Sequence, residues 1–167
     1  NIIKVKNRSS VLSKKNGNKD KLFAANITHV GILVTPEPKT SSEFIDTWIL
    51  KAIFSGIEPF IINNKIDIDS DKEYLDKLAI YKDIDIKIIS CSAKFGENLE
   101  VLQQFLESKC VLFVGNSGAG KSTVSSKVIG QKLKTNELSN NQGVHTTSVS
   151  SLYELPNKIK IIDSPGM

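Results

Sequence analysis

The chain has 167 residues, of which 40% are hydrophobic and 24% are charged, and its formal net charge is +4 at pH 7. This composition excludes a disordered polymer, and the length suits one medium-sized domain or one domain with a fragment of a second. No apolar run approaches the roughly 20 residues that a membrane-spanning helix needs, and no signal-peptide pattern is found, so we expect a cytoplasmic protein without a membrane partner.

The first 22 residues differ in character from the rest of the chain. They predict a strand, a turn at residues 16–18 and a basic linker. Their charged residues are one acid, Asp20, and seven bases: Lys4, Lys6, Arg8, Lys14, Lys15, Lys19 and Lys21. A basic stripe of this kind attracts polyphosphate backbones, and a solvated, lysine-rich surface is the simpler alternative.

From about residue 28 onward, apolar runs alternate with amphipathic runs. We predict strands at residues 29–35, 59–62, 85–89 and 111–114, and helices at residues 41–55, 71–81, 99–106 and 121–129. Residues 131–147 are polar without a period and predict a long loop, and residues 148–155 and 158–162 predict a pair of strands. This alternation predicts an α/β domain with a mostly parallel sheet, flanking helices and ligands at the carboxyl ends of the strands.

A glycine-rich loop with the pattern G-x-x-x-x-G-K-S lies between the strand at 111–114 and the helix at 121–129. The predicted phosphate-binding residues are Gly115, Asn116, Ser117, Gly118, Ala119, Gly120, Lys121, Ser122 and Thr123. Backbone N–H groups of such a loop close around a β-phosphate, and the helix N-terminus adds partial positive charge. We predict that Lys121 bridges the β- and γ-phosphates as a catalytic group and that the Ser122 hydroxyl binds Mg²⁺. A chance glycine-rich turn is the alternative.

Two short polar segments follow earlier strands. Asn64-Lys65-Ile66-Asp67 ends the strand at 59–62, and Ser92-Ala93-Lys94 ends the next one. Asp67 can accept two hydrogen bonds from guanine N1–H and N2–H₂, which adenine does not offer. Asn64 would lie near guanine N7 and O6 and join the two loops, Lys65 would pack its stem over the base, and the Ala93 N–H would contact O6. Each segment alone can arise by chance, and its position at a strand end favours base recognition.

The last motif is Asp163-Ser164-Pro165-Gly166, after an apolar strand. We predict that Asp163 holds Mg²⁺ through water and that the Gly166 N–H contacts the γ-phosphate. A simple Asp-initiated turn before proline is the alternative. A first switch is expected at residues 143–147, where one threonine, Thr147 or else Thr146, would reach Mg²⁺.

These signatures occur in an inverted order. An ordinary GTPase has its phosphate loop first, then its switches and its base-reading segment, whereas here the base-reading segment precedes the phosphate loop. The order predicts a circularly permuted P-loop GTPase domain that binds GTP or GDP.

With this order, the linker Leu22–Val30 and the first switch Gly143-Val144-His145-Thr146-Thr147, the chain resembles the ribosome small-subunit-dependent GTPase A family over nearly its whole length. The resemblance implies an OB-fold domain, a GTPase domain and a zinc-binding domain, in that order. Residues 1–22 would be the C-terminal remnant of the all-β OB-fold domain with its linker, and residues 23–167 the permuted GTPase domain, truncated before the zinc-binding domain, so that zinc is expected only in that missing part.

The resemblance also implies a function. Members of the family bind the rRNA of the small ribosomal subunit late in its maturation, and the subunit stimulates GTP hydrolysis. We expect this chain to be a monomer with guanine nucleotide and the small subunit as its partners.

One position bears on the hydrolytic step. Met167 follows Asp-Ser-Pro-Gly, where many GTPases have a glutamine that orients the attacking water. A thioether cannot do this, so we take His145 as the candidate catalytic residue because an imidazole can orient or deprotonate water near neutral pH. The alternative is that rRNA or another partner supplies the missing group.

Several functions remain open from the sequence. The first is a GTP-hydrolysing factor in small-subunit maturation. The others are a nucleotide-gated rRNA-binding module with incidental hydrolysis, another permuted ribosome-assembly GTPase, and a phosphate-loop ATPase or nucleotide kinase in which residues 64–67 match by accident.

Overall fold

The computed structural model describes residues 7–16, 19–130 and 151–163. Its main feature is a six-stranded sheet with the strand order β5-β4-β3-β6-β8-β7. The strands are β3 (His29–Val34), β4 (Glu58–Asn64), β5 (Lys87–Cys91), β6 (Cys110–Gly115), β7 (Ser151–Glu154) and β8 (Lys160–Asp163). All neighbours pair in parallel except β7, which pairs with β8 in the antiparallel sense. The predicted α/β architecture with a mostly parallel sheet is confirmed.

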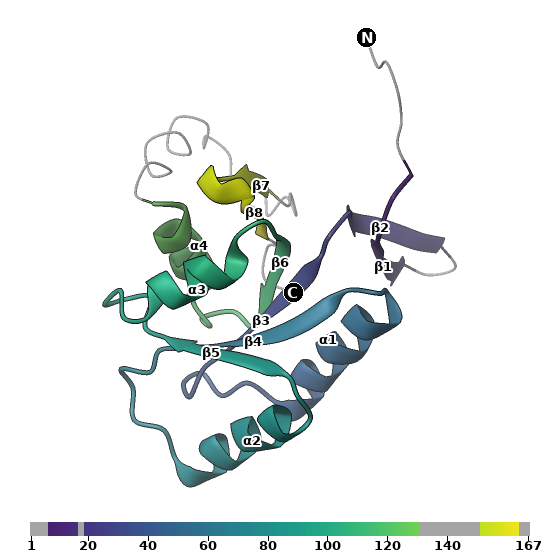
Figure 1. Ribbon diagram of the computed structural model, residues 1–167. Coiled ribbons are helices and arrows are strands. Elements are labelled where there is room, and N and C mark those ends of the chain that lie inside the picture. The colour runs from purple at the N-terminus through teal and green to yellow at the C-terminus, as the bar shows by residue number, and fades with distance from the viewer. Residues whose placement is uncertain (1–6, 17–18, 131–150, 164–167) are drawn as a thin grey trace, which may run out of the picture.

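Helices cover both faces of this sheet. Figure 1 shows α1 (Ser42–Phe54) and α2 (Lys72–Asp83) on one face and α3 (Leu99–Leu106) and α4 (Lys121–Ile129) on the other. Alternate residues of the central strand β3 serve the two cores: Val30 and Ile32 pack with α1 and α2, and Leu33 packs on the opposite side. None of the helices in the described ranges is long and apolar enough to span a bilayer.

Gly31, in the central strand β3, leaves room for two aromatic side chains of the neighbouring strands. A Cβ at this position would lie 2.8 Å from Cζ of Phe60 in β4 and 2.9 Å from Cδ1 of Phe113 in β6. The two aromatic rings therefore occupy the space above β3, and they bury large apolar surfaces next to α3 and α4.

The order in which strands are added to the sheet reverses at β3. The chain continues through β4 and β5 on one side, and later adds β6 and β8 on the other. In open α/β sheets ligands bind at such a switch point, beyond the carboxyl ends of the strands. The base-reading segment follows β4 and the glycine loop follows β6, so both lie at the carboxyl edge of the sheet on either side of β3.

A separate antiparallel hairpin of β1 (Val11–Asn16) and β2 (Lys19–Ala25) precedes the sheet. A strand is present as predicted, and the turn predicted at residues 16–18 includes residues 17 and 18, which lie outside the described residues. Residues 19–22, predicted as a basic linker, belong to β2, because pairing with β1 satisfies their backbone despite the local charge. The predicted boundary after residue 22 thus lies within a strand. Leu12 is buried in the core beside α1 and α2, which docks the hairpin. Its assignment to an OB-fold domain stays a prediction.

The other predicted elements agree with the structure apart from their ends. The strand predicted at 85–89 is β5, which begins two residues later. Asp85 has a positive φ of 62°, and the Ile86 N–H donates to the Tyr81 carbonyl, so both residues belong to the turn that ends α2. The predicted strand pair near the C-terminus is β7 and β8, joined through a 3₁₀ turn, Pro156–Lys158. The loop predicted at 131–147 lies outside the described residues.

Candidate nucleotide-binding site

The glycine-rich loop connects β6 to α4. Gly120 caps α4 with a φ of 90°, and a Cβ built on it would lie 2.5 Å from Asn64 Nδ2. Gly115 is also crowded, since its Cβ would lie 3.0 Å from the Cβ of Leu33. A side chain would therefore clash at these two positions, and the N–H groups of the loop and of the first turn of α4 can face a phosphate.

Lys121 lies against this loop. Its side chain is buried, and Nζ donates to the carbonyl oxygens of Gly115 at 2.5 Å and Asn116 at 3.1 Å. Ser122 and Thr123 follow in the first turn of α4 and are exposed. The ammonium group therefore lies at the loop, where a group that contacts phosphates is expected.

Asn64 connects the base-reading segment to both other loops. Its Nδ2 donates to the carbonyl oxygen of Ala119 in the glycine loop at 3.0 Å, and its Oδ1 accepts from the Ala93 N–H at 3.0 Å. The side chain is buried, so these contacts satisfy polar groups that water does not reach. The Ala93 N–H, predicted to reach guanine O6, is engaged with Asn64 here, so its contact with the base stays a prediction.

Asp67 is oriented by the Ser-Ala-Lys segment. The Ser92 hydroxyl, which is buried, donates to Asp67 Oδ1 at 2.5 Å and accepts from the Phe95 N–H at 3.4 Å. The carboxylate itself is exposed. The hydrogen bond fixes its rotation and leaves acceptor capacity for a ligand.

Lys65 and Lys94 flank the same region. Lys65 has a positive φ of 66°, and its Nζ donates to the Glu37 carbonyl at 2.8 Å, so its stem reaches from the end of β4 to the segment that follows β3. Lys94 is exposed, and its Nζ lies 4.9 Å from the centroid of the Phe95 ring. The structure thus brings Lys65 to the segment that follows β3 and places Lys94 over its aromatic neighbour.

Residues 35–40, between β3 and α1, form a feature that we did not predict from the sequence and that we call the strap. Thr35 Oγ1 donates to the Pro38 carbonyl at 2.8 Å, and the Thr35 N–H donates to Thr40 Oγ1 at 3.4 Å, so the strap closes on itself. Pro38 lies against Gly118 of the glycine loop, where a Cβ would be 3.4 Å from Pro38 Cγ. Two prolines directly after the central strand were the available signal.

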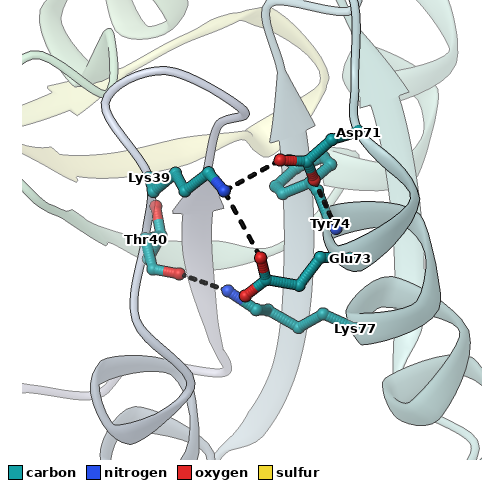
Figure 2. A network of polar contacts seen from close by, with 6 residues as sticks. All are labelled: Lys39, Thr40, Asp71, Glu73, Tyr74 and Lys77. Atoms are coloured by element: carbon teal, nitrogen blue, oxygen red, sulfur yellow. Dashed lines mark hydrogen bonds and ion pairs between the residues drawn. The ribbon is translucent and has the colours of Figure 1, made fainter.

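The strap is attached to α2 by two lysines (Figure 2). Lys39 Nζ lies 2.8 Å from Asp71 Oδ2 and 3.5 Å from Glu73 Oε2, and Lys77 Nζ donates to the Thr40 carbonyl at 2.9 Å. The hydrogen bond with Asp71 raises the pKa of Lys39 and lowers that of Asp71.

The remaining predicted residues divide into two groups. Asp163 ends β8, and its backbone pairs with Phe113, two residues before the glycine loop. His145, Thr146, Thr147 and Gly166 lie outside the described residues, so their roles stay predictions.

The donor set at the loop fits a nucleotide with Mg²⁺. A crowded glycine cradle at a helix N-terminus suits an anionic phosphate, and the exposed Ser122 hydroxyl is an oxygen donor of the kind that Mg²⁺ prefers.

Comparison with protein families gives a match over residues 5–167 to the model described as RsgA GTPase. A protein of Chlorobaculum parvum named "Small ribosomal subunit biogenesis GTPase RsgA" is 33% identical over 99% of this chain and 57% of its own length. A protein of the same name from Haemophilus influenzae is 37% identical over 88% of this chain and 44% of its own length. The chain therefore spans about half the length of these relatives.

Solved structures agree. The crystal structure of YjeQ from Thermotoga maritima has a TM-score of 0.71 at 26% identity, over 98% of this chain and 54% of that one. YloQ, described as a circularly permuted GTPase, has a TM-score of 0.60 at 16% identity, over 93% of this chain and 55% of that one, and this likeness concerns the fold alone. The predicted permuted fold is confirmed.

Proposed function

Since the chain belongs to the RsgA GTPase family, we propose that it binds GTP and hydrolyses it to GDP and phosphate in the maturation of the small ribosomal subunit. The observation that supports this most directly is the bridge made by Asn64, which ties the base-reading segment to Ala119 of the glycine loop and to Ala93. One buried amide thus joins the three segments that a guanine nucleotide has to touch together.

Selection for guanine rests on Asp67 in this proposal. Its carboxylate accepts from guanine N1–H and N2–H₂, and Ser92 holds it in the required rotation. Adenine offers no such pair of donors, and a site left with an unpaired acceptor discriminates strongly. The stem of Lys65, held by the Glu37 carbonyl, covers one face of the base.

The phosphates lie in the cradle formed by the glycine loop and the start of α4. Lys121 moves its ammonium from the carbonyls of Gly115 and Asn116 to the β- and γ-phosphate oxygens. Mg²⁺, when bound, supplies positive charge that offsets the charge developing on the phosphates. Ser122, Asp163 through water, and Thr147 or Thr146 are the groups that we assign to it.

Hydrolysis needs a group that orients the attacking water, and Met167 has no suitable atom. We assign this role to His145, with a group of the rRNA as the alternative. Replacing His145 by alanine should reduce turnover and leave GTP affinity unchanged. Equal turnover of this variant and the wild type on small subunits would assign the role to the partner.

The partner in this proposal is the small subunit, bound by the protein as a monomer, and assembly of that subunit places the protein in the cytoplasm. The basic residues of the first 22 positions suit contact with rRNA phosphates. Zinc is expected only in the part of the family's architecture that follows the GTPase domain.

Competition binding tests the base assignment. Labelled GTP should be displaced by unlabelled GTP and GDP, and ATP should fail at a concentration about a hundredfold higher. Displacement by ATP at equal concentration would show that residues 64–67 do not read guanine. GTP turnover with and without small subunits then separates a stimulated enzyme from a nucleotide-gated binding module, whose turnover would stay the same.

A further inference from the structure

The strap lies between the two halves of the proposed nucleotide site. It leaves β3, the strand at which the sheet changes direction, between β4 with the base-reading segment and β6 with the glycine loop. On one side its Glu37 carbonyl accepts from Lys65 at 2.8 Å. On the other side Pro38 lies against Gly118. A shift of the strap would therefore reach both the base and the phosphate sides.

The position of the strap depends on charge contacts with the first turns of α2. Figure 2 shows Lys39 reaching between Asp71 and Glu73, while Lys77 reaches back from α2 to the Thr40 carbonyl. Asp71 also caps α2, because its Oδ1 accepts from the Tyr74 N–H at 2.8 Å. The cap Asp71 comes only four residues after Asp67, so the residue that holds the strap is close in sequence to the base-reading segment.

We propose that Lys39 is a positioning residue for guanine nucleotide binding: by joining the strap to Asp71 and Glu73, it keeps the Glu37 carbonyl on Lys65 and Pro38 on the glycine loop. Lys39 has no role in the chemistry itself. The inference rests on the proposed function and adds a residue outside the motifs that define the nucleotide site.

The size and character of the effect follow from exposure. The side chains of Lys39 and Asp71 are 55% and 50% exposed, so water screens the pair and its contribution to overall stability is small. Nucleotide affinity is more sensitive. In a variant that lacks the contact of Lys39 with Asp71, the strap is less restrained before binding, and the nucleotide has to order it. We expect Lys39→Met to weaken GDP binding about two- to fivefold through faster dissociation, with an unchanged melting temperature.

The experiment measures the affinity and the dissociation rate of a fluorescent GDP for the wild type and five variants, of which Lys39→Met is the first. Lys39→Arg keeps the charge and should bind within about twofold of the wild type. Asp71→Asn keeps the helix cap, since asparagine also caps helices, and removes the charge, so it should resemble Lys39→Met. The double variant should be no weaker than either single one. Lys72→Met, at an exposed lysine next to Asp71, is the matched control and should bind as the wild type does.

Salt supplies an independent readout. Between about 0.1 M and about 1 M salt the Debye length falls from about 10 Å to about 3 Å, so the difference between the wild type and Lys39→Met should shrink. For the control variant Lys72→Met, the affinity should equal that of the wild type at both salt concentrations.

Two outcomes would overturn the inference: GDP affinity of Lys39→Met equal to that of the wild type, or additive losses in the double variant. Either could occur while the wild type still prefers GTP over ATP, so the proposed function would stand. If the wild type bound ATP equally well, the guanine assignment would fail, and the ratio of wild-type to variant affinity would still test the strap with either nucleotide. Failure of the wild type to bind any nucleotide would end both.

Discussion

The carboxylate of Asp67 is exposed, and the hydroxyl of Ser92 donates to one of its oxygens. Replacing Asp67 by asparagine keeps the shape and an acceptor for Ser92, but it presents an amide donor where guanine N2–H₂ also donates. We therefore expect Asp67→Asn to lose affinity for GTP and to gain affinity for xanthosine triphosphate, which has an oxygen at that position. Competition between the two nucleotides measures this, and an unchanged preference would remove Asp67 from base recognition.

Ser125, on α4, lowers the stability of the fold in a way that the sequence does not reveal. Its side chain is buried, and its hydroxyl has no hydrogen-bond partner in the described part of the chain. Because an unpaired buried hydroxyl is unfavourable and alanine favours helix, Ser125→Ala should raise the free energy of unfolding by about 1 kcal/mol.

Denaturant unfolding measures this change. The neighbouring Ser126 is partly exposed and provides the control, since Ser126→Ala should gain only the helix-propensity part, about 0.5 kcal/mol. Equal gains for both variants would contradict a buried, unsatisfied hydroxyl at Ser125.

At the scale of elements, the glycine loop depends on its neighbours as well as on its own backbone. Gly120 combines a positive φ with a close approach of Asn64, whereas Gly96 has a positive φ of 82° and no atom near its missing Cβ. Gly96→Ala should cost about 1 kcal/mol from backbone strain alone. Gly120→Ala should cost more and should also abolish nucleotide binding, because it displaces the amide that joins the loops.

Comparing the unfolding free energies and GDP affinities of these two alanine variants separates the two causes. If Gly120→Ala retained GDP affinity, Asn64 would not be needed to hold the loops together.

The sequence was sufficient to predict the strands from which the candidate site is built. Apolar runs predicted β4, β5 and β6, and the structure brings the segments that follow these strands together through the side chain of Asn64. The roles of these segments in binding guanine and phosphate stay predictions. The strap was missed because its position depends on Lys39 reaching Asp71 and on Lys77 of α2 reaching Thr40, two pairings over more than 30 residues that no local pattern encodes. The length of β2 was missed for a similar reason, since its partner β1 satisfies a backbone whose own residues read as a charged linker.

At the scale of the whole molecule, His29 lies at the opposite edge of the sheet from the site. It is buried, its ring nitrogen lies 3.3 Å from Glu58, and its ring packs edge-on to Phe60 and Phe105. Burial lowers the pKa of His29 below its ordinary value of 6.5, an effect that Glu58 opposes and Lys109 reinforces.

This lowered pKa predicts a loss of stability in mild acid. Below about pH 6.5, His29 binds a proton in the unfolded chain but stays neutral in the folded protein. The free energy of unfolding should therefore decrease as the pH is lowered, until the pKa of His29 in the folded state is reached. Asp71, whose pKa is lowered from 3.8, titrates at lower pH and contributes separately. Thermal melts between about pH 7 and about pH 5 should show a shallower dependence for His29→Gln than for the wild type, and identical slopes would contradict the prediction.

The pairing of β3 has a consequence for how the chain is made. His29 pairs with Glu58 on one side of the sheet and with Val111 on the other. During synthesis from the N-terminus, β4 therefore emerges long before β6. Until β6 has been made, the edge of β3 that pairs with it in the finished sheet has no partner strand. A nascent chain paused between these two points would present the unpaired backbone of a very apolar strand to other chains, which is the situation that invites aggregation.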